Sequence, residues 1–141
     1  MHQQADTHTN RVIVVDNDSA TTELIAEILT SIGCVPLCYA TGLLSVASID
    51  QARAHLLILE LVPGDSDAAL DLLGELRRNP HTRELPVIVN STDNHLLDRL
   101  AEALRDLGCV MMTKPFDLDD FFSSIRVCLD TGSSQMQRLA C

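Results

Sequence analysis

The sequence predicts a doubly wound α/β fold in which helices cover both faces of a five-stranded parallel sheet. Five short apolar or β-branched runs alternate along the 141 residues with five segments of helical pattern. One run, Leu56–Leu59, has four apolar residues without a polar break, which is typical of a strand buried on both faces. Right-handed crossovers join such strands into a parallel sheet, and the strand order 2-1-3-4-5 is one of two common arrangements.

The first strand and helix are marked by a change from β-branched to helical spacing. The strand is predicted at Arg11–Val15, and either Asp18 or Ser19 is placed to accept the free amides at the start of the helix. Gly33 is placed to end that helix. The apolar positions at helical spacing between these caps are Leu24, Ile25, Ile28, Leu29 and Ile32.

The second strand is predicted at Val35–Tyr39, where Pro36 is tolerated only near the strand start or at a sheet edge. A turn at Thr41-Gly42 and a short helix at Leu43–Arg53 follow, although the apolar period of this helix is weak. The second strand–helix unit is therefore expected to be the least regular part of the fold.

Three more strand–helix units complete the pattern. The central strand ends on Glu60 and leads through a Pro-Gly turn into a helix over about residues 67–79, and two further strands are predicted at 87–89 and 109–113. Gly108 is placed to end the helix between them. Three inward-facing sets mark the last three helices: Leu70, Leu73 and Leu76; Leu96, Leu97, Leu100, Leu104 and Leu107; Phe116, Leu118, Phe121, Phe122, Ile125 and Leu129.

The length fits one domain, predicted at residues 11–130. Residues 1–10 are polar and are expected to be disordered or frayed, and residues 131–141 form a polar tail that is also expected to fray. Met136 and Leu139 offer the alternative that the tail extends the last helix. No second domain is visible, so an output would act in trans or belong to a longer protein.

The net charge of −10 argues against binding nucleic acid or an anionic membrane surface. Arg77-Arg78 is the densest basic pair, and we interpret it as the polar end of a helix rather than a binding patch. The sequence has neither an apolar run near 18 residues nor a signal peptide, which predicts a cytoplasmic protein. The five cysteines show no metal-binding spacing and fit reduced thiols, and four of them, Cys34, Cys38, Cys109 and Cys128, are expected in the core.

Polar residues follow four of the five predicted strands and should meet at one edge of the sheet, because working sites lie at the carboxyl ends of parallel strands. Carboxylates beside an amide could hold a hard divalent cation, and a lysine with a hydroxyl could grip phosphoryl oxygens. Each residue alone is more typical of a helix cap or a solvated loop. The set comprises Asp16, Asn17, Glu60, Ser91 or Thr92, and Lys114.

Over residues 11–130 the sequence resembles the receiver domains of bacterial two-component response regulators. The resemblance rests on Val-Val-Asp-Asn-Asp after the first strand, Leu-Glu-Leu-Val-Pro-Gly-Asp-Ser-Asp after the third, Leu-Pro-Val-Ile-Val-Asn-Ser at the fourth and Thr-Lys-Pro-Phe after the fifth. It implies the flavodoxin-like form of the predicted fold. In that family two acidic residues and an aspartate bind Mg²⁺, and the aspartate accepts a phosphoryl group from a histidine kinase.

The resemblance places Asp16 and Asn17 at the acidic metal positions and Glu60 at the phosphoacceptor position. It places Ser91 at the switch hydroxyl, with Thr92 beside it, and Lys114 at the phosphoryl-contacting lysine. Two of these matches depart from the family, since Asn17 replaces an acid and Glu60 replaces the accepting aspartate. Mg²⁺ is therefore not expected to be required, and only weak Mg²⁺ binding at Asp16 and Glu60 is predicted.

Three smaller departures surround the same site. Pro63 follows Glu60 by three residues instead of the family's four, whereas Asp67 keeps the family's distance of seven and so supports Glu60 at the acceptor position. Met111 replaces the aromatic switch residue, and Ala68 replaces a glycine. Methionine fills space adaptably, so the route by which the family reports phosphorylation is expected to be altered.

These departures predict an atypical receiver that is not phosphorylated in the usual way and acts by contact with a histidine kinase or an output protein. It is expected not to be an enzyme. The adjacent rings of Phe121-Phe122 indicate either a wide buried stripe or a homodimer through the last helix. The alternatives are a phosphorylatable regulator, with the acceptor displaced or on Glu60 itself, and a small α/β enzyme such as a phosphatase or a flavin protein.

Overall fold

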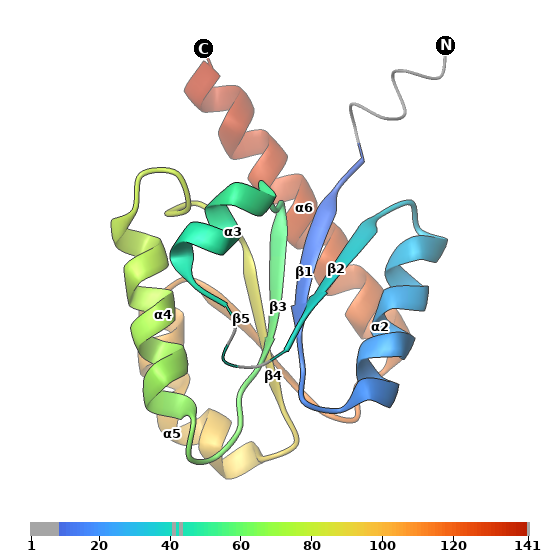
Figure 1. Ribbon diagram of the computed structural model, residues 1–141, viewed down its shortest axis with the longest axis vertical. Coiled ribbons are helices and arrows are strands. Elements are labelled where there is room, and N and C mark those ends of the chain that lie inside the picture. Colours follow the sequence, from blue (N-terminus) through green and yellow to red (C-terminus); the bar gives the residue numbers. More distant parts are fainter. Residues whose placement is uncertain (1–8, 41, 43, 141) are drawn as a thin grey trace.

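The computed structural model describes the backbone of residues 9–40, 42 and 44–140, and side chains as far as residue 130. It contains a five-stranded sheet of order β2-β1-β3-β4-β5 in which every neighbouring pair is parallel, as predicted (Figure 1). The strands are β1 Arg11–Val15, β2 Val35–Tyr39, β3 Leu56–Glu60, β4 Val87–Ser91 and β5 Cys109–Thr113. The helices are α2 Ser19–Ser31, α3 Val46–Ala52, α4 Ser66–Arg78, α5 Asn94–Asp106 and α6 Leu118–Ala140.

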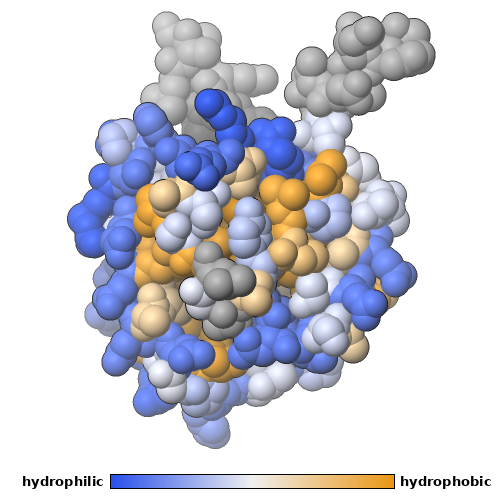
Figure 2. Space-filling view, in the orientation of Figure 1, coloured by the Kyte–Doolittle hydropathy of each residue, from blue (hydrophilic) through white to orange (hydrophobic). Residues whose placement is uncertain are grey.

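Helices cover both faces of the sheet, and side chains that alternate along each strand fill two separate cores. Ile13, Val89 and their like-facing neighbours pack against α3, α4 and α5. Val14 and Ile88 lie one residue away and pack against α2 and α6 on the other face. In Figure 1, α3 lies in front of the sheet and α6 behind it. The face that carries α3 has hydrophilic side chains around its rim and apolar ones towards its middle (Figure 2).

The caps of the first helix explain why it begins and ends where it does. Asp18 is the N-cap of α2, and its carboxylate accepts hydrogen bonds from the Ala20 amide and the Thr21 hydroxyl. Gly33 has φ +85° and follows the last turn, where the Cys34 amide donates to the Leu29 carbonyl at 2.9 Å. Of the two predicted caps, Asp18 and Ser19, the structure shows Asp18.

Two segments differ from the sequence-based expectation. Helix α3 begins at Val46 rather than Leu43, because Ser45 and Ser48 form a reciprocal capping box. Helix α6 continues to Ala140, which is the helical extension rather than the frayed tail. The frayed segment expected at residues 1–10 lies mostly outside the described residues. Pro36 lies in β2, which is an edge strand, as Pro36 requires.

The cysteine prediction was correct for three thiols and wrong for one. Cys34, Cys109 and Cys128 are buried, and burial raises the pKa of each thiol. Cys38 is exposed, because it lies on the edge strand β2, where residues have a neighbouring strand on one side only. The four described cysteines are free thiols. Among the described residues, no helix combines the length and apolar character needed to cross a membrane.

Arg77 lies in the last turn of α4, as predicted, and its guanidinium donates to backbone carbonyls. Its Nε donates to the Leu107 carbonyl at 2.7 Å, and its Nη1 donates to the Leu85 carbonyl at 2.7 Å and the Arg83 carbonyl at 3.0 Å. One side chain therefore ties the end of α4 to the segment before β4 and to the end of α5. Its neighbour Arg78 is exposed.

The substitution Arg77→Met is expected to lower the free energy of unfolding by about 2–3 kcal/mol, because hydrogen bonds from a charged group to carbonyls are lost while the apolar stem remains. Arg78→Met, one residue away and exposed, provides the matched control and is expected to change stability by less than about 0.5 kcal/mol. Urea denaturation monitored by circular dichroism measures both. Equal effects of the two substitutions would contradict the role assigned to Arg77.

Candidate functional site

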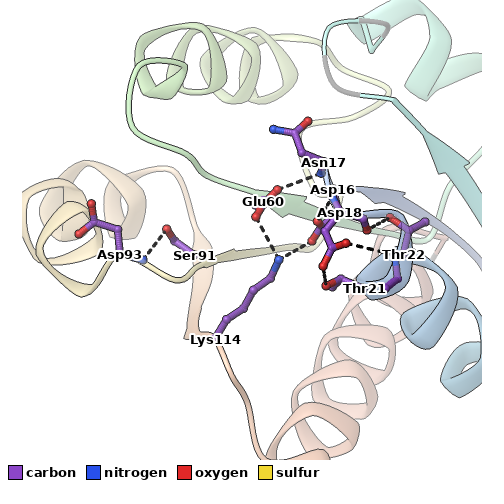
Figure 3. A network of polar contacts seen from close by, with 10 residues as sticks. Asp16, Asn17, Asp18, Thr21, Thr22, Glu60, Ser91, Asp93 and Lys114 are labelled. Carbon is purple, nitrogen blue, oxygen red and sulfur yellow. Dashed lines mark hydrogen bonds and ion pairs between the residues drawn. The ribbon is translucent and has the colours of Figure 1, made fainter.

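The carboxyl ends of β1, β3 and β5 bring Asp16, Glu60 and Lys114 into direct contact (Figure 3). Asp16 follows β1, Glu60 is the last residue of β3, and Lys114 follows β5. The Lys114 Nζ lies 2.5 Å from Asp16 Oδ2 and 3.1 Å from Glu60 Oε2, so one ammonium bridges two carboxylates. The sequence predicted that these residues meet at one sheet edge, and the structure places them there. We call these three residues the charged triad.

Every oxygen of the two carboxylates accepts a hydrogen bond from this chain. Asp16 Oδ1 accepts from the Asp18 amide at 2.9 Å, and Glu60 Oε1 accepts from the Asn17 amide at 3.0 Å. The remaining oxygens, Asp16 Oδ2 and Glu60 Oε2, accept from Lys114. The two carboxylates are thus held by two backbone amides and one ammonium, which is a closed arrangement.

The side chains of the charged triad are largely shielded from solvent, so the pairing of their charges affects stability. The side chains of Asp16, Lys114 and Glu60 are 1%, 10% and 12% exposed, respectively. Two carboxylates and one ammonium leave one net negative charge in the group. Burying charges is costly unless they are paired and hydrogen-bonded, and removing one partner of such a group is strongly destabilising.

Asn17, predicted at a metal position, contributes its backbone rather than its side chain to the charged triad. Its amide N–H donates to Glu60, whereas its carboxamide points away from Glu60 and Lys114 in Figure 3. A backbone N–H directed at the Glu60 carboxylate supplies no oxygen to a cation. The described residues contain no group of three or more histidine, cysteine or acidic side chains arranged to hold a metal ion.

Ser91 and Thr92 were predicted to contact a phosphoryl group, and Ser91 contacts the charged triad through its backbone, since its carbonyl accepts a hydrogen bond from the Lys114 amide at 2.8 Å. Ser91 is buried at the end of β4, and its hydroxyl accepts a hydrogen bond from the Asp93 amide at 3.1 Å. Figure 3 shows this hydroxyl turned towards Asp93 rather than Lys114. Thr92 is exposed, and Asp93 caps α5 by accepting from the Leu96 amide. In this structure the β4–α5 loop therefore uses the Ser91 hydroxyl to support its own turn.

Met111, predicted at the aromatic switch position, is half-buried in β5. It packs against the core on the side of α3, α4 and α5. Its flexible side chain fills space there without a polar tip. The position thus has a packing role in this structure, and it lies on the opposite face of β5 from Met112, which packs on the side of α2 and α6.

Asn90 lies beside Glu60 near the end of β4, and the sequence did not predict it as a site residue. Its side chain is completely buried in β4, and neither Oδ1 nor Nδ2 has a hydrogen-bond partner among the described residues. The strand register pairs Asn90 with Glu60 of β3 on one side and Met112 of β5 on the other. The sequence feature that could have identified Asn90 is an amide side chain directly after the apolar run Val87–Val89, where a hydrocarbon side chain would be expected.

No protein-family model matches this chain. The Response regulator Rcp1 of Synechocystis sp. is 25% identical over 124 residues, which cover 82% of this chain and 83% of that protein.

Solved receiver domains share the fold at lower identity. A CheY-like response regulator receiver domain protein from Methanospirillum hungatei has a TM-score of 0.74 at 18% identity, covering 90% of this chain and 98% of that one. The receiver domain of sensor histidine kinase PA1611 from Pseudomonas aeruginosa has a TM-score of 0.71 at 18% identity, covering 86% and 98%. That structure carries a magnesium ion coordinated in its active-site cleft.

Proposed function

We infer that this chain, a receiver domain of the two-component response regulator type, signals by protein contact without passing through a phosphorylated state. The observation that supports this inference is the closed state of the Glu60 carboxylate, which is bound by the Asn17 amide and by Lys114. In the proposed role, the fixed negative charge of Glu60 takes the place of a phosphoryl group that is added and removed reversibly.

The extra methylene of glutamate gives this position its contacts. An aspartate at residue 60 would hold its carboxylate about one carbon–carbon bond closer to the strand, and so further from Lys114. Glutamate instead is long enough to reach the Lys114 ammonium and forms an ion pair with it. A carboxylate whose oxygens both accept strong hydrogen bonds is a poor nucleophile towards a phosphoryl donor. In this proposal the domain therefore does not change its charge by phosphorylation at Glu60.

The arrangement also disfavours Mg²⁺, and we propose that the domain works without it. A divalent cation would have to share the oxygens of Asp16 and Glu60 with Lys114, whose positive charge repels it. The acid-to-amide change at Asn17 removes a further attraction of about 4 kcal/mol for each unit of charge on the ion, at an effective dielectric near 20. A Mg²⁺ ion bound here would be held by Asp16 and Glu60 and would neutralise phosphoryl oxygens, which is the chemistry proposed to be lost.

The partners we propose are proteins, namely a histidine kinase or an output protein, and a cytoplasmic location follows from that role. Helix α6 offers apolar contact area, since Leu118 and Val127 are 51% and 61% exposed. Phe121 is completely buried and Phe122 is half-buried against the same core, which favours the wide buried stripe over an interface. A homodimer through α6 remains a prediction, and no catalytic activity is proposed.

Incubation with acetyl phosphate and Mg²⁺, followed by intact-mass measurement, tests the proposal. We expect the wild-type chain to gain no phosphoryl mass, because the acceptor oxygens are engaged and the cation site is weakened. A stoichiometric mass increase would overturn the proposal in favour of a phosphorylatable regulator. Peptide mapping of the modified protein would then distinguish Glu60 from a displaced acceptor.

A further inference from the structure

The side chain of Asn90 is buried without a hydrogen-bond partner among the described residues, which is rare for an amide and destabilising. Both of its polar atoms are affected, so exchanging the amide oxygen and nitrogen does not resolve it. Neighbouring core residues of β4 are apolar, and Ile88 occupies the same strand face two residues earlier. We therefore expect a polar partner close to the Asn90 side chain.

The strand register indicates where that partner lies. Glu60 and Asn90 are directly paired across β3 and β4, which places their backbones about 4.8 Å apart. Ile58 and Ile88 pack on the side of α2 and α6, so Glu60 and Asn90, each two residues further on, face the same side. The Asn90 side chain thus begins beside Glu60 and on the same face of the sheet.

The Lys114 ammonium can donate one further hydrogen bond. An ammonium carries three N–H groups, and those to Asp16 and Glu60 account for two of them. The Lys114 side chain is only 10% exposed, so water has limited access to the third. An amide oxygen is a suitable acceptor for it, and staggered side-chain torsions allow the Asn90 carboxamide to rotate towards the ammonium.

We propose that Asn90 is a positioning residue: on rotation from the unpaired conformer seen in the structure, its Oδ1 accepts the third N–H of Lys114 and holds the ammonium between Asp16 and Glu60. This inference deepens the proposed function, on which it rests, because a fixed lysine keeps Glu60 closed. Asn90 thereby completes the charged triad from inside the sheet. The bond removes the cost of the buried amide and the limited solvation of the ammonium together.

The test replaces Asn90 by a hydrocarbon of similar size. Asn90→Leu is expected to lower the melting temperature and to abolish the slowly exchanging Lys114 ammonium resonance in ¹H–¹⁵N spectra. Asn90→Asp keeps an acceptor oxygen and is expected to retain that resonance. Ile88→Leu, two residues earlier on the same strand face, controls for altered core packing and should leave the resonance unchanged.

An amide with no partner predicts the opposite result, since replacing it with leucine would raise the melting temperature and leave Lys114 unaffected. That outcome would overturn the proposal, and so would a wild-type chain without a protected ammonium resonance. A double-mutant cycle with Lys114→Met gives a further check, because Asn90→Leu should lose its destabilising effect in that background. These readouts need neither Mg²⁺ nor a phosphoryl donor, so phosphorylation of the wild type would overturn the proposed function separately.

Discussion

The double variant Asn17→Asp, Glu60→Asp is expected to gain a phosphoryl group from acetyl phosphate in the presence of Mg²⁺. The shorter side chain at residue 60 withdraws its carboxylate from the Asn17 amide and Lys114, which frees oxygens for a cation and a phosphoryl donor. The added carboxylate at residue 17 restores an attraction of about 4 kcal/mol per unit of ionic charge, which corresponds to about a thousandfold in affinity for each unit of charge. Intact-mass spectra with and without EDTA measure the gain.

The two single variants separate the contributions. Glu60→Asp alone restores an aspartate acceptor without the second acid and is expected to be modified only at high Mg²⁺ concentration. Asn17→Asp alone improves the cation site but leaves Glu60 extended to Lys114, so it should bind Mg²⁺ without gaining mass. A double variant that stays unmodified would show that the shifted Pro63 loop has also closed the pocket, and that restoring two residues is insufficient.

The fold could be predicted because its signals are local and repeat along the chain. Continuous apolar runs require strands buried on both faces, and helical stripes between them require crossovers, which together leave few topologies. The extent of α6 was harder to predict, because Thr131, Gly132, Ser133 and Ser134 are weak helix formers. The start of α3 depends on two serine side chains that cap each other, a detail that apolar spacing does not report.

The candidate site could be predicted in position but not in contacts. Parallel strands end at one edge, and that is enough to bring Asp16, Glu60 and Lys114 together. Some of the contacts are made by backbone amides, such as the Asn17 amide that donates to Glu60. The residue types in a sequence do not reveal such backbone contacts. Ser91 turns to Asp93 because the loop needs an acceptor there. Asn90 was detectable as an amide beside an apolar run, yet only the strand register places it beside Glu60.

The charged triad implies a second large effect, on stability. Lys114→Met is expected to lower the free energy of unfolding by about 3–5 kcal/mol, because it leaves Asp16 and Glu60 as neighbouring carboxylates without a cation in a shielded site. Methionine keeps most of the stem, so the loss reports the charge rather than the packing. Urea denaturation at neutral pH measures it. The matched control is Arg126→Met on α6, where the side chain is exposed and the expected change is below about 0.5 kcal/mol.

The origin of that loss can be separated by a second substitution. In the Lys114→Met background, Glu60→Gln removes one of the two facing charges and is expected to restore part of the stability, whereas the same change in the wild type removes a partner of Lys114 and should destabilise. Opposite signs in the two backgrounds would show that the pairing of Lys114 with Glu60 is what closes the site. The same sign in both would mean that Glu60 contributes through its other contact, the Asn17 amide, and that the lysine is dispensable to the closed state.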